Sequence, residues 1–349
     1  MNIEKKTVAS SKGDVTILTL TNASGAKVTL SSLGACIVGV EVPDREGKMD
    51  DVVLGYADVT DYYYDGPCAG KVPGRVANRI DRGHFVLDGK DYELAINNGP
   101  NALHGGPEGF QNQIWDVEVT PEGKVKFTYF SKDGEEGYPG NLTATAEYEW
   151  TDDCELKLHL GATADAHTIV NLTNHAYFNL AGHNSGSVLD HTLKLDAHLF
   201  LPTTDSLIPT GNLEAVKSTP MDFTKAKALG ADIKAEFPAL TFGKGYDNCY
   251  VIDGWNPGEL RHCATLEDPK SGRVLDVLTT QPGVQIYTGN WLAGSPKNKA
   301  GRSYEDYDGV AIECQGLPDS INHPQFPSVE LRPGETYSED IIFKFSTKN

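Results

Sequence analysis

Residues 143–160, TATAEYEWTDDCELKLHL, decide the fold class of this chain. Apolar and polar residues alternate on both sides of residues 151–154, and a period of two residues is typical of strands with one buried face. Similar short blocks recur along the chain, at residues 15–20, 27–30, 38–42, 125–130, 192–196, 259–266, 274–278, 284–288 and 341–345. The alternation therefore predicts an all-β protein.

The spacing of these blocks indicates one large sandwich. Helical signals are confined to residues 222–229 and 231–237, which are too short to form a second layer. Strands that recur without intervening helices of about 10 residues exclude a βαβ architecture. No low-complexity linker and no repeat of about 20 to 50 residues divides the chain, so we expect a single domain, residues 1–349, folded as a large antiparallel β-sandwich. Such folds bind ligands on a concave sheet face.

The composition limits the partners. The chain carries 30 Lys plus Arg against 49 Asp plus Glu, a net charge of −19. A nucleic acid is excluded as a partner, because its phosphates need a basic surface. The negative net charge also favours a neutral ligand over an anionic one. The six cysteines are widely spaced without a Cys-x-x-Cys motif, which indicates neither a zinc site nor a dense disulfide framework.

The N-terminal residues 1–14 are polar, so the sequence shows no secretory signal, although a leader removed earlier stays an open alternative. No apolar run of about 18 residues could form a membrane helix. We expect a cytoplasmic protein without a membrane partner, as a monomer or weak homodimer.

Two ionisable residues interrupt apolar strand-like segments. His175 lies in NLTNHAYFNL (residues 171–180), where burial would leave several polar groups in need of partners, as in a ligand pocket. A lone histidine in such a segment is also compatible with a structural role, satisfied by a backbone carbonyl. Glu313 follows the apolar residues 310–312, and its structural alternative is a buried salt bridge.

Eight segments together resemble the aldose 1-epimerase family, the galactose mutarotases. They are GRVANRI (74–80), LHGG (103–106), DGEEGYPG (133–140), NLTNHAYFNL (171–180), IPTG (208–211), GYD (245–247), TTQPGVQIYTGN (279–290) and IECQ (312–315). The resemblance runs from Gly34 to residues 331–335. It implies a large β-sandwich with an open cleft across one concave sheet, and neither a metal nor an organic cofactor.

The resemblance also implies roles for single residues. His175 corresponds to the general acid of the family and Glu313 to its general base. The implied contacts with sugar hydroxyls are Asn78, Arg79, His104, Asp247 and Gln285. We add Tyr177 as a substrate-binding residue, because it lies two residues beyond His175 and on the same face of a regular strand.

The chemistry of a mutarotase needs this pair. To interconvert the α and β anomers of a free aldose, a base must take the proton of the anomeric hydroxyl while an acid protonates the ring oxygen. We expect that a small pKa shift protonates His175 near neutrality and that burial raises the pKa of Glu313. The predicted enzyme is an aldose 1-epimerase acting on neutral aldohexoses such as D-galactose and D-glucose, with the preference between them left open.

Three alternatives remain. A hexose-6-phosphate 1-epimerase would add a phosphate clamp, for which these segments supply only Arg75 and Arg79. A non-catalytic carbohydrate-binding sandwich would keep Asp247 but would not need both His175 and Glu313. A polysaccharide lyase or glycosidase would need a second carboxylate opposite Glu313, which the motifs do not supply.

Overall fold

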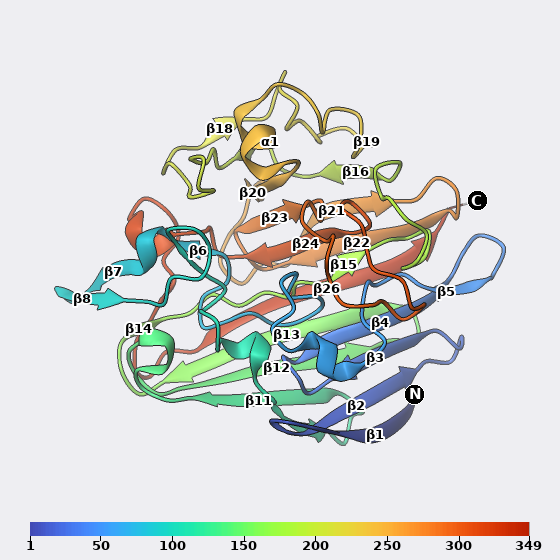
Figure 1. The fold of residues 1–349 in the computed structure, drawn as a ribbon, viewed down its shortest axis with the longest axis horizontal. Coiled ribbons are helices and arrows are strands. Elements are labelled where there is room, and N and C mark those ends of the chain that lie inside the picture. Colours follow the sequence, from blue (N-terminus) through green and yellow to red (C-terminus); the bar gives the residue numbers. More distant parts are fainter. Residues whose placement is uncertain (349) are drawn as a thin grey trace.

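The computed structural model describes residues 1–348, which form three larger sheets and three strand pairs (Figure 1). The largest sheet has nine strands. In spatial order they are β10 (Asp116–Val119), β11 (Val125–Ser131), β12 (Leu142–Trp150), β13 (Glu155–Ala164), β26 (Tyr337–Thr347), β22 (Arg273–Thr279), β21 (Arg261–Glu267), β16 (Thr192–Leu195) and β19 (Lys227–Ala228). All neighbouring strands in this sheet run antiparallel.

Two smaller sheets complete the framework. The six-stranded sheet has the order β15 (Tyr177–Phe178), β24 (Val310–Gln315), β23 (Gly283–Tyr287), β20 (Asp247–Val251), β17 (Leu199–Phe200) and β18 (Glu214–Ala215). The five-stranded sheet contains β1 (Asn2–Ser10), β2 (Gly13–Thr21), β3 (Lys27–Ser31), β4 (Cys36–Pro43) and β5 (Met49–Asp51). The strand pairs are β6 (Arg79–Ile80) with β9 (Ala102–Leu103), β7 (His84–Leu87) with β8 (Lys90–Glu93), and β14 (Thr168–Ile169) with β25 (Glu330–Leu331).

Short helices occupy the connections. Within residues 1–348, one α-helix, α1 (Pro238–Gly243), precedes β20, and five 3-10 turns lie in loops: η1 (Val59–Tyr62), η2 (Asp81–Gly83), η3 (Phe110–Asn112), η4 (Glu135–Gly137) and η5 (Ser320–Asn322). Among residues 1–348 we find no helix with the length and apolar character needed to cross a membrane.

The nine- and six-stranded sheets enclose the main core, to which the five-stranded sheet also contributes residues such as Leu18, Val28 and Val40. Residues of β12 alternate between buried and half-exposed along the whole strand, so one face of the large sheet turns inward. Phe178 of β15 packs against Phe343 of β26 with 5.2 Å between ring centroids, and the Sγ atoms of Cys263 and Cys314 approach to 3.8 Å. These contacts join the two sheets face to face, and the prediction of a large antiparallel β-sandwich is confirmed.

The strand predictions are confirmed more fully than the helix predictions. Each predicted block overlaps an observed strand, from β2 to β26. The sequence analysis missed β1, an edge strand without buried residues, and several shorter strands such as β10 and β20. It identified only the apolar start of β24, because all six residues of β24 are buried and show no alternation.

Both predicted helical stretches are wrong. Residues 222–229 form irregular backbone, bends and the short edge strand β19, whose backbone pairs with β16. Residues 231–237 form bends and one turn. Phe223 and Leu229 are buried in the main core. A stretch this short gains too little from helix propensity to outweigh strand pairing and apolar burial.

Candidate active site

The outer face of the six-stranded sheet carries one row of functional side chains. In the register of β23 and β24, Gln285 lies opposite Glu313, and in that of β20 and β23, Asp247 lies opposite Tyr287. Tyr177 of β15 lies opposite Ala311, two residues before Glu313. Because side chains alternate between the faces of a sheet, these residues project to the same side, away from the main core.

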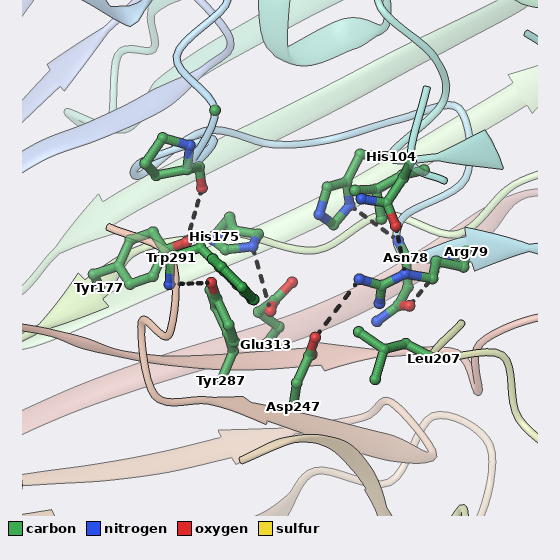
Figure 2. Close-up of a pocket in the computed structure, with 14 residues that line it drawn as sticks. Asn78, Arg79, His104, His175, Tyr177, Leu207, Asp247, Tyr287, Trp291 and Glu313 are labelled. Carbon is green, nitrogen blue, oxygen red and sulfur yellow. Dashed lines mark hydrogen bonds and ion pairs between the residues drawn. The ribbon is translucent and has the colours of Figure 1, made fainter. Parts of the chain in front are cut away.

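Loops outside the six-stranded sheet lie over this face and form a cavity with it (Figure 2). Its volume is about 320 Å³, within the usual range for small-molecule sites. Three loop-rich segments, residues 56–91, 99–113 and 289–308, all contribute to it. The lining residues are Gly66, Pro67, Asn78, Arg79, Asn98, Leu103, His104, His175, Tyr177, Leu207, Asp247, Tyr287, Trp291 and Glu313.

His175 and Glu313 meet in this cavity. Nε2 of His175 lies 3.5 Å from Oε1 of Glu313, and the two residues are 4% and 2% exposed. Oε2 of Glu313 has no hydrogen-bond partner within residues 1–348. The pair therefore offers a nitrogen and a carboxylate oxygen within reach of one small ligand.

Burial shifts the pKa values of this pair in opposite directions. It lowers the pKa of His175 to about 4, and the positive charge of Lys71 adds to this shift. It raises the pKa of Glu313 well above its ordinary value, with a further increase from the negative charge of Asp247 and an opposing effect of Arg79. The expectation that a small shift would protonate His175 near neutrality is wrong, because desolvation disfavours the imidazolium. The direction expected for Glu313 is confirmed.

His104 is fixed in one neutral tautomer. Its Nδ1 accepts a hydrogen bond of 3.0 Å from the backbone N–H of Asn78, so the ring proton is on Nε2. Burial lowers the pKa of His104 well below its ordinary value, and the nearby His175 and Arg79 lower it further. His104 can therefore donate a hydrogen bond to a ligand in the cavity.

The same tautomer bears on metal binding. His104, His175 and Glu313 present possible ligand atoms within 4.8 Å of one another, a donor set found in zinc enzymes. A metal ligand must offer a lone pair, whereas Nε2 of His104 holds a proton and Nδ1 is occupied by the N–H of Asn78. The three residues as arranged do not suit a metal ion.

A polar network borders the opposite side of the cavity. Nη2 of Arg79 lies 3.6 Å from Oδ2 of Asp247, and Nε of Arg79 donates to Oδ1 of Asn98 at 2.9 Å. Oδ1 of Asn78 accepts the backbone N–H of Arg79 at 2.8 Å, which leaves its amide nitrogen for the cavity. These side chains can donate hydrogen bonds to the hydroxyl groups of a ligand and accept hydrogen bonds from them.

Two predicted binding residues make hydrogen bonds within the protein. Gln285 lies behind Asp247 rather than in the lining, and its Nε2 donates to Oδ1 of Asp247 at 2.7 Å. Tyr177 lines the cavity, but its hydroxyl donates to the carbonyl of Pro67 and its ring packs 5.0 Å from that of His175. His175 itself precedes β15, so the two residues do not share a regular strand.

The sequence analysis did not select several lining residues. Tyr287 lies two residues after Gln285, and strand alternation could have found it. Asn98, Leu207 and Trp291 come from loops, where no periodic pattern indicates which side chains face a ligand. Trp291 is 64% exposed at the rim.

A β-sandwich whose polar cavity holds a buried imidazole–carboxylate pair defines an enzyme of acid–base chemistry on a polyhydroxylated ligand. The profile of the aldose 1-epimerase family matches residues 16–344. The chain belongs to this family, and is thus a carbohydrate epimerase.

Known relatives agree with this assignment. The chain is 47% identical to galactose mutarotase from Bos taurus and 45% identical to that from Homo sapiens, in each case over 92% of this chain and 91% of the relative. It is 37% identical to aldose 1-epimerase from Escherichia coli strain K12 over 94% of both chains. Among solved structures, a GalM/aldose epimerase homologue from C. elegans superposes with a TM-score of 0.88 at 32% identity, covering 99% of this chain and 100% of that chain. Galactose 1-epimerase from Lactobacillus acidophilus gives 0.86 at 27% identity, covering 100% and 99%.

Proposed function

We propose that this protein is a hexose mutarotase, which interconverts the α and β anomers of free sugars such as D-galactose and D-glucose. The observation that carries the proposal is the distance of 3.5 Å between Nε2 of His175 and Oε1 of Glu313 on the floor of a cavity lined by hydroxyl-binding side chains. The names of the relatives point to the same activity.

In the proposed reaction, Glu313 takes the proton of the anomeric hydroxyl while protonated His175 gives its proton to the ring oxygen. The bond between the anomeric carbon and the ring oxygen breaks, and an acyclic aldehyde results. Rotation of the aldehyde and reversal of both proton transfers close the ring as the other anomer. His175 thus acts as the acid in ring opening and as the base in ring closure. The steps transfer protons and break or form one carbon–oxygen bond, without oxidation or reduction, so they need no cofactor.

Ring opening starts from protonated His175 and ionised Glu313, the placement of the proton that burial disfavours, so the pKa shifts of the pair favour proton transfer in the opening direction. After ring opening, the proton is on Glu313 and His175 is neutral, which is the arrangement that burial favours. The two groups share one proton, so the acid and basic limbs of the pH profile belong to the pair rather than to either residue. At high pH the pair loses this proton and has no acid left to protonate the ring oxygen. At low pH the pair gains a second proton and has no base left to take the proton of the anomeric hydroxyl.

The substrate preference for neutral sugars rests on the surroundings of two arginines. Arg79 lines the cavity, but its guanidinium already engages Asp247 and Asn98. Arg75 is 1% exposed, and its guanidinium donates to backbone and hydroxyl oxygens away from the cavity. A phosphate clamp would need free guanidinium groups, so the hexose-6-phosphate alternative is disfavoured.

Polarimetry tests the proposal. Purified protein should accelerate the optical drift of freshly dissolved α-D-glucose and α-D-galactose well above the buffer rate, and should act less well on glucose 6-phosphate. His175→Asn and Glu313→Gln should each lower kcat about 10²- to 10⁴-fold, with unchanged circular dichroism. A drift equal to that in buffer would disprove the activity, and near-normal kcat in either variant would disprove the role of that residue.

We also propose a cytoplasmic protein of one domain, residues 1–349, that is a monomer or weak homodimer. All six cysteines have free thiols in the described structure, as expected in a reducing compartment. Apolar residues from Leu18 to Phe345 share one core, which supports a single domain. Light scattering over a concentration series would test the oligomeric state.

A further inference from the structure

The orientation of His175 depends on a neighbouring segment, residues 65–71. The backbone N–H of His175 donates to the carbonyl of Lys71 at 2.9 Å, and its carbonyl accepts the N–H of Gly70 at 2.9 Å. Residues 172–176 belong to no strand. They lie between residue 171, which forms an isolated β-bridge, and the start of β15. These two hydrogen bonds, rather than a strand ladder, therefore hold the backbone of His175.

The same segment holds the neighbours of His175. Nδ2 of Asn174 donates to the carbonyl of Gly70 at 2.8 Å, and the hydroxyl of Tyr177 donates to the carbonyl of Pro67 at 2.9 Å. Pro67 also lines the cavity. Any shift of residues 65–71 would therefore move the whole wall that carries the imidazole.

A buried ion pair fixes this segment at its two ends. The side chains of Asp65 and Lys71 are 0% and 1% exposed and contact each other directly. The pair makes four further hydrogen bonds, from Nζ of Lys71 to the carbonyl of Tyr62 (2.5 Å) and Oδ1 of Asn112 (3.3 Å), and to Oδ2 of Asp65 from the hydroxyl of Tyr56 (2.9 Å) and the N–H of Ala69 (2.8 Å).

The ion pair is a costly way to gain stability. Two charges lose their hydration on burial, and a well-packed apolar pair often stabilises a fold equally well. Neither Lys71 nor Asp65 belongs to the residues that line the cavity. The benefit of the pair thus lies in the defined geometry of the segment and in the positive charge that it places near His175.

We propose that Lys71 and Asp65 are positioning residues, which hold residues 65–71 so that His175 points at the ring oxygen of the sugar. This inference rests on the proposed function. Lys71 acts through the backbone of His175 and through its charge, because its positive charge lowers the pKa of His175.

Lys71→Met tests the inference, since Met retains the length of the side chain without its charge. The variant should lose about 10- to 100-fold in kcat, because a displacement of about 1 Å at an acid–base group costs up to roughly 100-fold. KM should change less than about threefold, as the hydroxyl-binding network is intact. Loss of the cation should raise the pKa of His175, so the acid limb of the pH profile should move to higher pH and NMR titration of the imidazole should show the same shift.

Lys299→Met is the matched control. Lys299 forms another ion pair, with Asp51, and its Nζ also donates to the carbonyls of Val38 and Val53. This pair lies outside the lining of the cavity. Lys299→Met should therefore lower the thermal stability while leaving kcat and both limbs of the pH profile unchanged.

If Lys71→Met does not fold, the double variant Asp65→Asn/Lys71→Met replaces it, because neither charge is then left unpaired. A folded Lys71→Met variant with wild-type kcat and an unmoved acid limb would overturn the positioning role. For the double variant, which removes both charges, wild-type kcat alone would overturn it. Wild-type protein that does not accelerate mutarotation would instead refute the proposed function. Without that activity, the NMR titration alone tests the inference, and an unchanged His175 pKa in the Lys71→Met variant would overturn it.

Discussion

Replacement of Asp247 with Asn should both weaken sugar binding and shift the pH profile of kcat/KM. Oδ1 of Asp247 accepts a hydrogen bond from Gln285, and Oδ2 lies 3.6 Å from Nη2 of Arg79 at the edge of the cavity. The negative charge of Asp247 is also the main cause, after burial, of the raised pKa of Glu313. Asn has the same shape but lacks this charge.

The size of the binding effect follows from the lost charge. A hydrogen bond to a charged group contributes about 1.5 to 3 kcal/mol, which corresponds to an increase in KM of about 10- to 150-fold. The pKa of Glu313 should fall, because a like charge no longer opposes its ionisation. The pair then loses its shared proton at lower pH, so the basic limb of the kcat/KM profile should move to lower pH.

Initial rates from polarimetry at several sugar concentrations, repeated across the pH range, measure both effects. Asp253→Asn is the matched control, because Asp253 is an exposed carboxylate that pairs with His198. The control should keep the wild-type KM and pH profile. A folded Asp247→Asn variant with KM within twofold of the wild-type value, or with an unmoved basic limb, would refute this account of the site.

Two further predictions concern groups behind the cavity wall. Gly105→Ala should lower the thermal midpoint strongly, because φ of Gly105 is +78° and an added Cβ would lie 1.9 Å from the carbonyl oxygen of Gly74. Gly123→Ala, at φ +81° with open space around it, should cost only about 1 to 2 kcal/mol, and equal losses in the two variants would contradict the steric argument. Gln285→Leu should raise KM several-fold by removing the hydrogen bond that holds Asp247, whereas an unchanged KM would show that Asp247 needs no such support.

The strands could be predicted because their signal is local. The alternation in β12 and β13 reflects one buried face of one sheet, and the sequence shows it directly. The helix predictions failed because pairing of β19 with β16 and burial of Phe223 involve distant parts of the chain. The burial of β24 on both faces likewise arises only when the cavity and the core lie on opposite sides of it.

The candidate site divides in the same way. Motif resemblance indicated His175, Glu313, Asn78 and Arg79, and the fold brings them around one cavity. It could not indicate that Gln285 lies behind Asp247, because a motif contains residue types but not the depth at which each side chain lies.

The sequence by itself determined the all-β fold class, the family and the chemical groups available for acid–base work, because alternation and motifs are properties of neighbouring residues. Only the tertiary structure decided the protonation of those groups. The tautomer of His104 depends on the N–H of Asn78, and the low pKa of His175 depends on burial and on Lys71. Hydration and charge at each group are set by segments that meet only in the folded chain.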